Sequence, residues 1–483
     1  MSIYSSYSKN LSDNNTERFN KDLINTKAND NVLDYIDAIC KSLEIIPGIT
    51  YMGSEYLTNK KFYVPNIDTK KDIDITNSVL DTIRFTFKLE AQEEVEYITK
   101  DLYFPRLLKN QYFIIDGNRY IPIFQMVDAG TYLNDNCLTL KTLLMPIKVR
   151  NKVTTIEDMD GNSYTGMNFE LDMFKNKINV FMYYFCKFGI DEALEYFGMD
   201  AEISSKKVAY EGIDIVNFQI SKNIYVGVTK EYLEECNEHV DLVITLCNCL
   251  NNRCKIDDQE FWLRRLGSHF TKNTVQQEEK AKGILLSLER ILDEITKKVL
   301  RTDGANKQDV YSIIKWMIMN YRLLSKQDTL DIDNKRLRVY EYILNPLLIR
   351  FSKSTYRLLN SKITVHALKT IFSNIHKGTL VKEIVRNELV RYKNTVNTYD
   401  LFSCFLKITQ SGPQTNFASG NINPKFRDIH VSMVDRIDLC STSNGDPGAN
   451  GSLVPFCKLY KNLHFSEQPT YMSDSEMEDE SDE

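Results

Sequence analysis

The chain has 483 residues, of which 42% are hydrophobic and 11% aromatic, and it carries 60 Lys and Arg against 66 Asp and Glu. This length exceeds what one hydrophobic core holds, so several domains of a folded, globular protein are expected. No apolar run reaches the roughly 18 residues of a membrane span, and the polar N-terminus lacks the apolar centre of a signal peptide. The ten cysteines show no paired spacing, which indicates free thiols in a reducing compartment.

The N-terminal part is expected to combine a helix with short strands. Residues 1–30 are polar and are expected to lack order. Apolar residues at helical spacing then predict a helix over 32–43, which Pro47 ends. Alternation with period two predicts strands at 61–64 and 82–88.

A β-hairpin is predicted at residues 112–121. Its first strand is apolar and is followed by Asp116-Gly117, a pair that tolerates the positive φ angles of a tight turn. A second strand follows at once. Any β protein can contain such a hairpin, so by itself it indicates structure and not function.

The region from about 150 to 325 has two features that resemble metal sites. Asp158 begins an acidic stretch like a calcium loop, but Ser163 and Phe169 stand where an EF-hand needs Gly and Glu, so a turn is predicted. Cysteines with a nearby histidine form the second: Cys236, Cys247, Cys249, Cys254 and His239. Zinc ligands usually come as Cys-x₂₋₄-Cys pairs, and the spacing here favours buried reduced thiols over zinc.

The same region is predicted to be mainly helical. Two helices are expected within 178–199 on either side of Gly189, and a strand at 225–228. One long helix is predicted over 276–300, with Glu294 and Lys298 paired one turn apart, and another over 310–324.

The most distinctive stretch covers residues 331–362. An Asp-rich turn gives way to basic residues and then to an apolar pattern at helical spacing. Residues 335–394 hold 13 Lys and Arg against 3 Glu and no Asp, a charge of +10 in a chain of net charge −6. A basic block of this length on amphipathic helices is typical of a surface that meets a polyanion, and it favours nucleic acid over a solvated helix face.

The C-terminal part is predicted to change from helix to loops. Helical spacing continues over 363–394, and an apolar stretch at 401–409 leads into a loop at 410–416. A glycine-bearing loop covers 444–454. Residues 473–483 hold 7 acidic residues and no basic one, which favours a solvated, disordered terminus over a nucleic-acid mimic.

Three of these stretches, in this order, resemble the second-largest (β) subunit of multisubunit DNA-dependent RNA polymerases. The hairpin is similar to the family's Gly-x-Phe-Ile-Ile-Asn-Gly-x-Glu-Arg-Val, with Gln111 for the Gly and Asn118 for the Glu. The stretch 334–338 is similar to the family's Asn-Arg-Arg-hydrophobic-Arg after an Asp-rich turn. Further matches to the family's Gly-Pro, Arg-Asp-Val-His and Gly-Arg steps are Gly412-Pro413, Arg427-Asp428-Ile429-His430 and Arg436.

The sequence also departs from the family pattern. Asp435 stands where the family has Gly, Leu439 and Cys440 break its Cys-Pro step, and the glutamate of its Pro-Glu-Gly loop is absent. The resemblance therefore supports the fold of this region better than single nucleotide contacts. His430 has two readings, a structural histidine beside Asp428 or a direct contact.

The resemblance implies a multi-domain α+β fold of mixed helices and short antiparallel sheets, with the protrusion, lobe and fork of a β subunit. The expected divisions are a polar N-terminal segment at 1–30, the first part of the protrusion at 31–150, the lobe at 151–325, the second part of the protrusion at 326–400, the fork at 401–472 and an acidic tail at 473–483.

The function implied is that of the N-terminal half of a naturally split β subunit, of the kind found in giant bacteriophages. Such a chain forms one wall of the DNA cleft and the fork near the DNA–RNA hybrid, and it belongs to a nucleotidyltransferase that is inactive without its other chains. No catalytic or metal-binding residue is assigned here, because Mg²⁺ is expected on a β′-like chain. The residues expected to bind nucleic acid are Lys335, Arg336, Arg338, Arg350, Arg357, Gln410, Gly412, Pro413, Arg427, Asp428, His430 and Arg436.

The expected partners are a β C-terminal chain, β′-like chains, a promoter-specificity factor, the DNA template and the RNA transcript, with no membrane. The expected location is the cytoplasm of an infected bacterium or the virion. The alternative is a viral structural or nucleic-acid-packaging protein that uses a basic helical surface.

Overall fold

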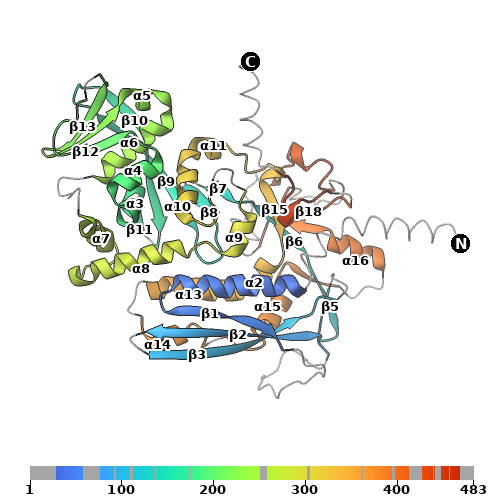
Figure 1. Cartoon of the computed structure of the whole chain (residues 1–483). Coiled ribbons are helices and arrows are strands. Elements are labelled where there is room, and N and C mark those ends of the chain that lie inside the picture. The colour runs from blue at the N-terminus through green and yellow to red at the C-terminus, as the bar shows by residue number, and fades with distance from the viewer. Residues whose placement is uncertain are drawn as a thin grey trace. The chain divides into compact units, whose positions relative to one another are not determined.

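The fold is α+β, as predicted, with helices packed on small, mostly antiparallel sheets (Figure 1). No helix in the described part of the chain is long and apolar enough to cross a membrane. The computed structural model describes residues 29–57, 77–91, 94–108, 112–134, 137–174, 176–210, 212–250, 258–301, 305–359, 363–373, 375–393, 397–412, 427–438, 440, 448–455 and 457–467.

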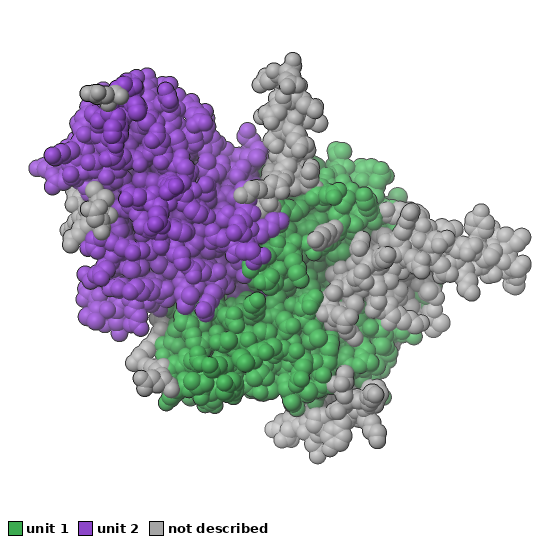
Figure 2. Space-filling model, viewed as in Figure 1, with its two compact units in different colours: residues 1–130, 293–301, 327–483 green, residues 131–292, 302–326 purple. Residues whose placement is uncertain are grey.

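The chain divides into two compact units (Figure 2). Unit 2 is inserted into the sequence of unit 1, and the chain passes from unit 1 to unit 2 after Gly130. The names protrusion, lobe and fork stay predictions. Unit 1 comprises Met1–Gly130, Asp293–Arg301 and Gln327–Glu483, and unit 2 comprises Thr131–Leu292 and Thr302–Lys326.

Unit 1 begins with a helix on a sheet. Helix α2 (Asn29–Ser42) packs on β1 (Ile49–Tyr56), which pairs with β2 (Leu80–Ala91), and β2 pairs with β3 (Glu94–Pro105). Alternate side chains of β2 are fully buried, as expected of a sheet with one face on a core. The predictions of a helix at 32–43 and a strand at 82–88 are confirmed, and the one at 61–64 lies outside the described residues.

The predicted hairpin is confirmed. Strand β4 (Phe113–Ile115) pairs antiparallel with β5 (Asn118–Pro122), and the turn residues Asp116 and Gly117 have φ angles of 52° and 74°. Strand β16 (Val390–Tyr392) adds to the other side of β5, so the sheet order is β16-β5-β4.

The helix predicted over 363–394 is shorter than expected. It consists of α14 (Val365–Lys369) and α15 (Thr379–Arg386), and the chain then becomes the strand β16. The reason lies in Asn387, whose side chain accepts a hydrogen bond from the backbone N–H of Leu389 at 2.9 Å and so ends the helix with an Asx turn.

In unit 2 the strands form the sheets β11-β10-β9-β8-β7 and β12-β14-β13. The turn predicted at Asp158 is confirmed and joins two long strands, because its carboxylate accepts backbone N–H groups of residues 160 and 162. The strands of these two sheets are β7 (Thr131–Asn134), β8 (Cys137–Leu140), β9 (Ile147–Glu157), β10 (Ser163–Met173), β11 (Asn176–Asn179), β12 (Ala201–Ser204), β13 (Ile215–Ser221) and β14 (Ile224–Thr229).

The predicted pair of helices around Gly189 is confirmed in unit 2. Helix α3 (Val180–Phe188) ends at this glycine, which has a φ of 88°, and α4 (Ile190–Phe197) begins after it. Helix α6 (Asn237–Cys249) packs along β10, and it carries Cys247 and Cys249, which are buried free thiols as predicted. Burial raises the pKa of the Cys247 thiol to about 12.

The helix predicted over 276–300 is wrong as one element. It is α8 (Gln277–Glu289) in unit 2 and α9 (Glu294–Val299) in unit 1. Asp293 separates the two because its carboxylate accepts the backbone N–H of Thr296 at 2.7 Å and caps α9. Within α9, Glu294 pairs with Lys297 at 3.2 Å and not with Lys298.

The helix predicted over 310–324 is also divided in two. Helices α10 (Val310–Met319) and α11 (Tyr321–Ser325) meet at Asn320. The Asn320 side chain donates to the carbonyl oxygen of Trp316 at 2.9 Å, and such a local bond competes with a continuous helix.

Candidate nucleic-acid interface

One sheet of unit 1 brings together strands that lie in or next to the three stretches that carry the resemblance, while the hairpin strands themselves belong to the sheet β16-β5-β4. The order of the first sheet is β15 (Lys335–Arg338), β6 (Phe124–Asp128), β17 (Lys407–Thr409) and β18 (Asn450–Ser452) (Figure 1). We call it the junction sheet. Strand β6 directly follows the hairpin, β15 is the start of the basic stretch, and β17 and β18 lie next to the two glycine-containing loops. Segments far apart in the sequence thus meet in one hydrogen-bonded layer.

The basic residues 335–338 form a strand, which corrects the prediction of a helix from residue 335. Lys335 lies opposite Asp128 and Arg338 opposite Gln125, so the stretch is paired to β6 along its length. Helices begin only after it, as α12 (Tyr340–Ile343) and α13 (Asn345–Leu359).

The three cations of β15 are buried, with 3%, 8% and 2% of Lys335, Arg336 and Arg338 exposed. The Lys335 ammonium lies 2.9 Å from the carboxylate of Asp128. Arg336 and Arg338 both pair with Glu341, at 2.9 and 3.2 Å. Each of the three is paired with a carboxylate inside the chain, Glu341 being shared by the two arginines, which favours a structural role, and their contact with phosphate stays a prediction.

Glu341 is the anion that makes this buried cluster possible. Burial raises the pKa of its carboxyl, but the guanidinium groups of Arg336 and Arg338 lower it more, to about 2. Glu341 is therefore charged at neutral pH. A buried carboxylate between two guanidinium groups is stable only as a complete set, because each charge removed leaves another without compensation.

Gln125 connects the buried cluster to the loop that follows β17. Its side-chain oxygen accepts from Arg338 Nε at 2.9 Å, and its amide nitrogen donates to the carbonyl of Ser411 at 3.0 Å. Gly412 comes next with a φ of 115°, and a Cβ there would lie 3.0 Å from the Gln125 amide nitrogen. The close approach explains glycine at this position.

Two further predicted contacts lie in the same loop. The Gln410 side chain is 3% exposed and donates to the carbonyl of Gly448 at 2.9 Å, so it joins the loop to the segment before β18. Gly412 shapes the backbone beside Gln125, and Pro413 lies outside the described residues. Contact of these residues with nucleic acid stays a prediction.

The segment 427–438 is joined to the Asp-rich turn. His430 caps the 3-10 helix η5 (Val431–Met433) by accepting the N–H of Ser432, and its other ring nitrogen lies 3.5 Å from Asp328. The acid beside His430 is thus Asp328 and not Asp428, which is exposed. Arg436 forms an ion pair with Asp333.

Arg427 completes the connection between these segments. Its carbonyl oxygen accepts the N–H of Gly448 at 2.8 Å, and Gly448 also binds Gln410. Among the described residues of the third stretch, Gln410, Arg427, His430 and Arg436 are each held by a hydrogen bond or an ion pair within unit 1. These contacts explain the positions of Arg427, His430 and Arg436 without a ligand.

Helix α13 presents the exposed cations of the basic stretch. Arg350, Lys353 and Arg357 stand three and four residues apart, so they lie along one face. Lys353 and Arg357 are exposed and Arg350 is half-buried, while the opposite face packs into the core. The helix contains no Asp or Glu. We call these three residues the α13 stripe. Two of them belong to the predicted set.

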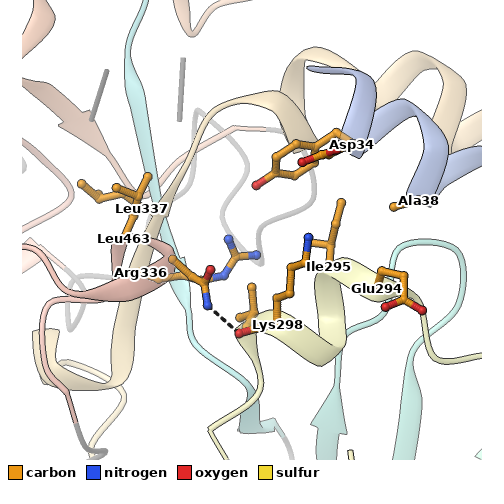
Figure 3. Close-up of a pocket in the computed structure, with 11 residues that line it drawn as sticks. Asp34, Ala38, Glu294, Ile295, Lys298, Arg336, Leu337 and Leu463 are labelled. Atoms are coloured by element: carbon orange, nitrogen blue, oxygen red, sulfur yellow. Dashed lines mark hydrogen bonds between the residues drawn. The ribbon is translucent and has the colours of Figure 1, made fainter. Parts of the chain in front are cut away.

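A pocket of about 170 Å³ lies beside Arg336 in unit 1 (Figure 3). Charges of both signs line it, including Asp34 on α2, and the side chain of Asn462 donates to the carbonyl of Lys298 at one side. Small-molecule sites usually measure roughly 300–1,000 Å³. The volume and mixed charge indicate a gap next to the buried cluster and not a substrate site.

Metal ligands do not gather in the part of the chain that the structure describes, where no group of three or more His, Cys, Asp or Glu side chains is placed to hold an ion. Of the predicted cysteine cluster, Cys236 is half-buried, while Cys254 lies outside the described residues. The expected Mg²⁺ on another chain stays a prediction.

Sequence reasoning missed the residues that organise this region. Gln125 carried a usable signal, because it is a polar residue inside the apolar run Ile123-Phe124-Gln125-Met126-Val127 and must find partners when buried. Glu341 carried another, as the first acid after three cations. Lys353 was seen as basic but left out of the predicted set.

The family whose pattern matches this sequence is described as non-virion RNA polymerase subunit, and the match covers residues 2–480. It spans both compact units and every segment of the junction sheet. No curated protein matches the sequence.

Proposed function

Because the chain belongs to the family of non-virion RNA polymerase subunits, we propose that it is the N-terminal half of a split β subunit in a bacteriophage DNA-directed RNA polymerase. The family supports a subunit of a transcribing, multi-chain complex. The identity as a β half and the split rest on the resemblance of the hairpin, the basic stretch and the fork segment.

The junction sheet is the observation that carries this proposal. Three stretches that resemble the β subunit lie apart along the sequence. Strand β15 belongs to the basic stretch, β6 directly follows the hairpin, and β17 and β18 adjoin the loops of the third stretch; these four strands pair in one sheet of unit 1. A chance resemblance gives no reason for the three to be neighbours. In a β half they would have to meet, because together they support the fork beside the DNA–RNA hybrid.

In this role the chain positions nucleic acid and leaves the chemistry to a partner. Phosphate groups of the DNA bind the α13 stripe, in which Lys353 and Arg357 are exposed and Arg350 is half-buried, on a helix without acids. Nucleotidyl transfer needs a metal pair that stabilises the attacking and leaving oxygens, and a β′-like chain supplies it. The buried cations of β15 hold the wall in shape.

The family description also bears on location. It names a polymerase other than the one carried in the virion, which favours the cytoplasm of the infected bacterium over the packaged state. The complex would then form during infection.

Purification from infected cells tests the proposal. A tagged chain should bring down a β′-like chain with the triple-Asp loop and a separate β C-terminal chain, and the eluate should incorporate ribonucleotides on a DNA template. The tagged chain expressed alone is the control and should make no RNA.

Two outcomes would contradict the proposal. Recovery with capsid or packaging proteins, and without a triple-Asp chain, would favour the structural alternative. RNA synthesis by the chain alone would show that it carries its own catalytic centre.

A further inference from the structure

Strand β16 presents a tyrosine at the open edge of the sheet β16-β5-β4. Tyr392 is the last residue of the strand and is 58% exposed. It lies opposite Tyr120 on β5, and the two rings contact edge to face with centroids 5.8 Å apart. Residues opposite each other in an antiparallel pair share a face, so the two rings form one aromatic surface.

Cations accompany the two rings on the same two strands. Arg391 is exposed and has no carboxylate partner among the described residues. Arg119 lies over the ring of Tyr112 at 5.3 Å, and Lys393 extends the pairing by donating its N–H to the carbonyl of Arg119 at 2.9 Å. Successive side chains of a strand alternate between faces, so Arg391, Lys393 and Arg119 lie along the same edge on the face opposite the two rings.

Near this edge the acidic side chains are fewer than the cationic ones, and one of the acids already forms an ion pair. Asp400 pairs with Lys393 at 2.9 Å. Asp116 lies close enough to Tyr120 to contribute, after burial, to the raised pKa of that phenol. Lys407, on β17, adds a positive charge near the buried Cys404, together with Arg391 and Lys393. The charge along this edge therefore complements an anionic ligand.

From this arrangement we infer that the β5–β16 edge is a stacking platform for single-stranded nucleic acid. An unpaired base stacks on the ring of Tyr392, Tyr120 supports that ring from the side, and Arg391, on the opposite face of the same edge strand, binds a phosphate where the nucleic acid passes around the edge. The inference rests on the proposed function, because a transcription complex contains unpaired DNA and RNA. It adds residues that the resemblance did not assign.

The chemistry favours a single strand over a duplex. Bases in a duplex already stack on each other and offer no free face, whereas an unpaired base gains about 1–3 kcal/mol from an aromatic side chain. The α13 stripe has cations at helical spacing and suits the phosphates of a duplex. Aromatic rings distinguish the β5–β16 edge from that stripe.

Equilibrium binding of fluorescent oligo(dT) to the purified full-length chain tests the platform. Tyr392→Ala should weaken binding by at least about fivefold, and Tyr392→Phe should restore it to within about twofold, because stacking needs the ring and not the hydroxyl. Arg391→Gln should reduce the slope of log affinity against log salt by about 0.7. Tyr97→Ala is the matched control, since Tyr97 is 62% exposed on β3 of the same unit.

The outcomes separate a structural effect from a binding effect. Equal weakening by Tyr392→Ala and Tyr97→Ala, or no rescue by Tyr392→Phe, would overturn the platform. An unchanged melting temperature of Tyr392→Ala is expected because the ring is exposed, and it confirms that the variant is folded.

A second measurement uses the assembled polymerase and keeps this inference distinct from the proposed function. DNA with 5-iodouracil in the unpaired region should crosslink on irradiation to a peptide that contains Tyr392. If the chain purifies with a β′-like chain but this peptide is never labelled and Tyr392→Ala binds normally, the platform is wrong while the subunit role stands. If no polymerase chain accompanies it, the subunit role fails, whatever the oligonucleotide does.

Discussion

Strand β15 and helix α13 come from the same basic stretch and put their charges to opposite uses. The cations of β15 are between 2% and 8% exposed and are all paired with side chains of unit 1. On α13, Lys353 and Arg357 are exposed and no acid shares the helix. A count of charge over 335–394 treats the two as one surface, but only the helix offers cations to a ligand.

The difference teaches where to look for a structural cation in a basic sequence. Residues 335–338 are followed at once by Glu341, which reaches both arginines, and they face Gln125 and Asp128 across a strand pair. Helix α13 has no such acid within reach in sequence. Nearby carboxylates hold the cations of β15 inside unit 1, whereas Lys353 and Arg357 are exposed on a helix without acids, and Arg357 donates to the hydroxyl of Thr370 at 2.6 Å.

The largest effect should come from removing the anion of the β15 cluster. Glu341→Ala leaves two buried guanidinium groups without a counter-charge, and we expect unit 1 to lose about 3–5 kcal/mol of its free energy of unfolding. Hydrogen exchange at the amides of β6 and β15 measures this loss directly, since both strands belong to the junction sheet.

Glu383→Ala is the matched control, because Glu383 is an exposed acid on α15 and its loss should change stability by less than about 0.5 kcal/mol. Replacing Arg336, Arg338 and Glu341 together by Met, Met and Leu should recover most of the stability, since no buried charge is then left alone. If Glu341→Ala and Glu383→Ala both change the free energy of unfolding by a similar, small amount, the cations of β15 do not depend on Glu341, and the contrast between β15 and α13 is wrong.

Gln125 extends the buried network from β15 to the loop, so its substitution should have the next largest effect. Gln125→Met keeps the shape of the side chain but leaves Arg338 Nε and the carbonyl of Ser411 without this partner. We expect a loss of about 1–3 kcal/mol in the free energy of unfolding. Gln219→Met, at an exposed glutamine of β13, should be close to neutral in the same chemical denaturation. Equal effects would show that Gln125 fills space and connects nothing.

His464 lies opposite Arg336 of β15 in an isolated bridge. This histidine makes the stability of the region around β15 sensitive to acid. Burial and the nearby Arg301 and Arg336 lower the pKa of its imidazole from 6.5 to about 3. Below pH 6.5 the imidazole of His464 therefore binds a proton in the unfolded chain but stays neutral in the folded chain. Stability is fully present above pH 6.5 and falls as the pH decreases, by on the order of 2 kcal/mol at pH 5.

The substitution His464→Phe should remove this slope between pH 7 and pH 5, and thermal unfolding at each pH measures it. His366→Phe, at an exposed histidine of α14, should leave the slope unchanged. The Glu341 carboxyl titrates separately, because its pKa falls from 4.5 to about 2 on folding and its contribution is lost only below about pH 4.5. A wild-type slope in His464→Phe would mean that another group carries it.

Local patterns predicted much of the fold. The alternation of 82–88, the Asp116-Gly117 turn and the helices around Gly189 all follow from neighbours in the sequence, and the structure contains each. The errors occurred where a polar side chain interrupts an apolar pattern. Asp293 caps a new helix and Asn387 ends one, and periodicity alone does not reveal which backbone N–H such a side chain will bind.

The site was less predictable, because its partners are distant in sequence. Residue types and motif order pointed to segments that lie in or next to the strands of the junction sheet, and their role in binding nucleic acid stays a prediction. The direction of each cation depends on contacts such as Lys335 with Asp128, 207 residues apart. The pairing of Tyr392 with Tyr120 could not be predicted from the sequence either, since the pattern over residues 390–392 predicts a helix.

Substitutions in the α13 stripe should have the smallest effect on stability, and they test directly whether the cations of this helix bind DNA. Changing Arg350, Lys353 and Arg357 to Gln removes charges at the surface, so the free energy of unfolding should change by less than about 0.5 kcal/mol per site. In the assembled polymerase, each lost phosphate contact should reduce the slope of log affinity for duplex DNA against log salt by about 0.9.

Lys206→Gln, Lys222→Gln and Lys272→Gln, at three exposed cations of unit 2, form the charge-matched control and should leave the slope unchanged. If the slope of log affinity against log salt is the same in the stripe variant, the α13 cations form only a solvated helix face, which is the alternative that the sequence also allowed. A slope that falls without loss of stability, beside a Glu341→Ala variant that loses stability first, would show that one basic stretch serves both the fold and the ligand.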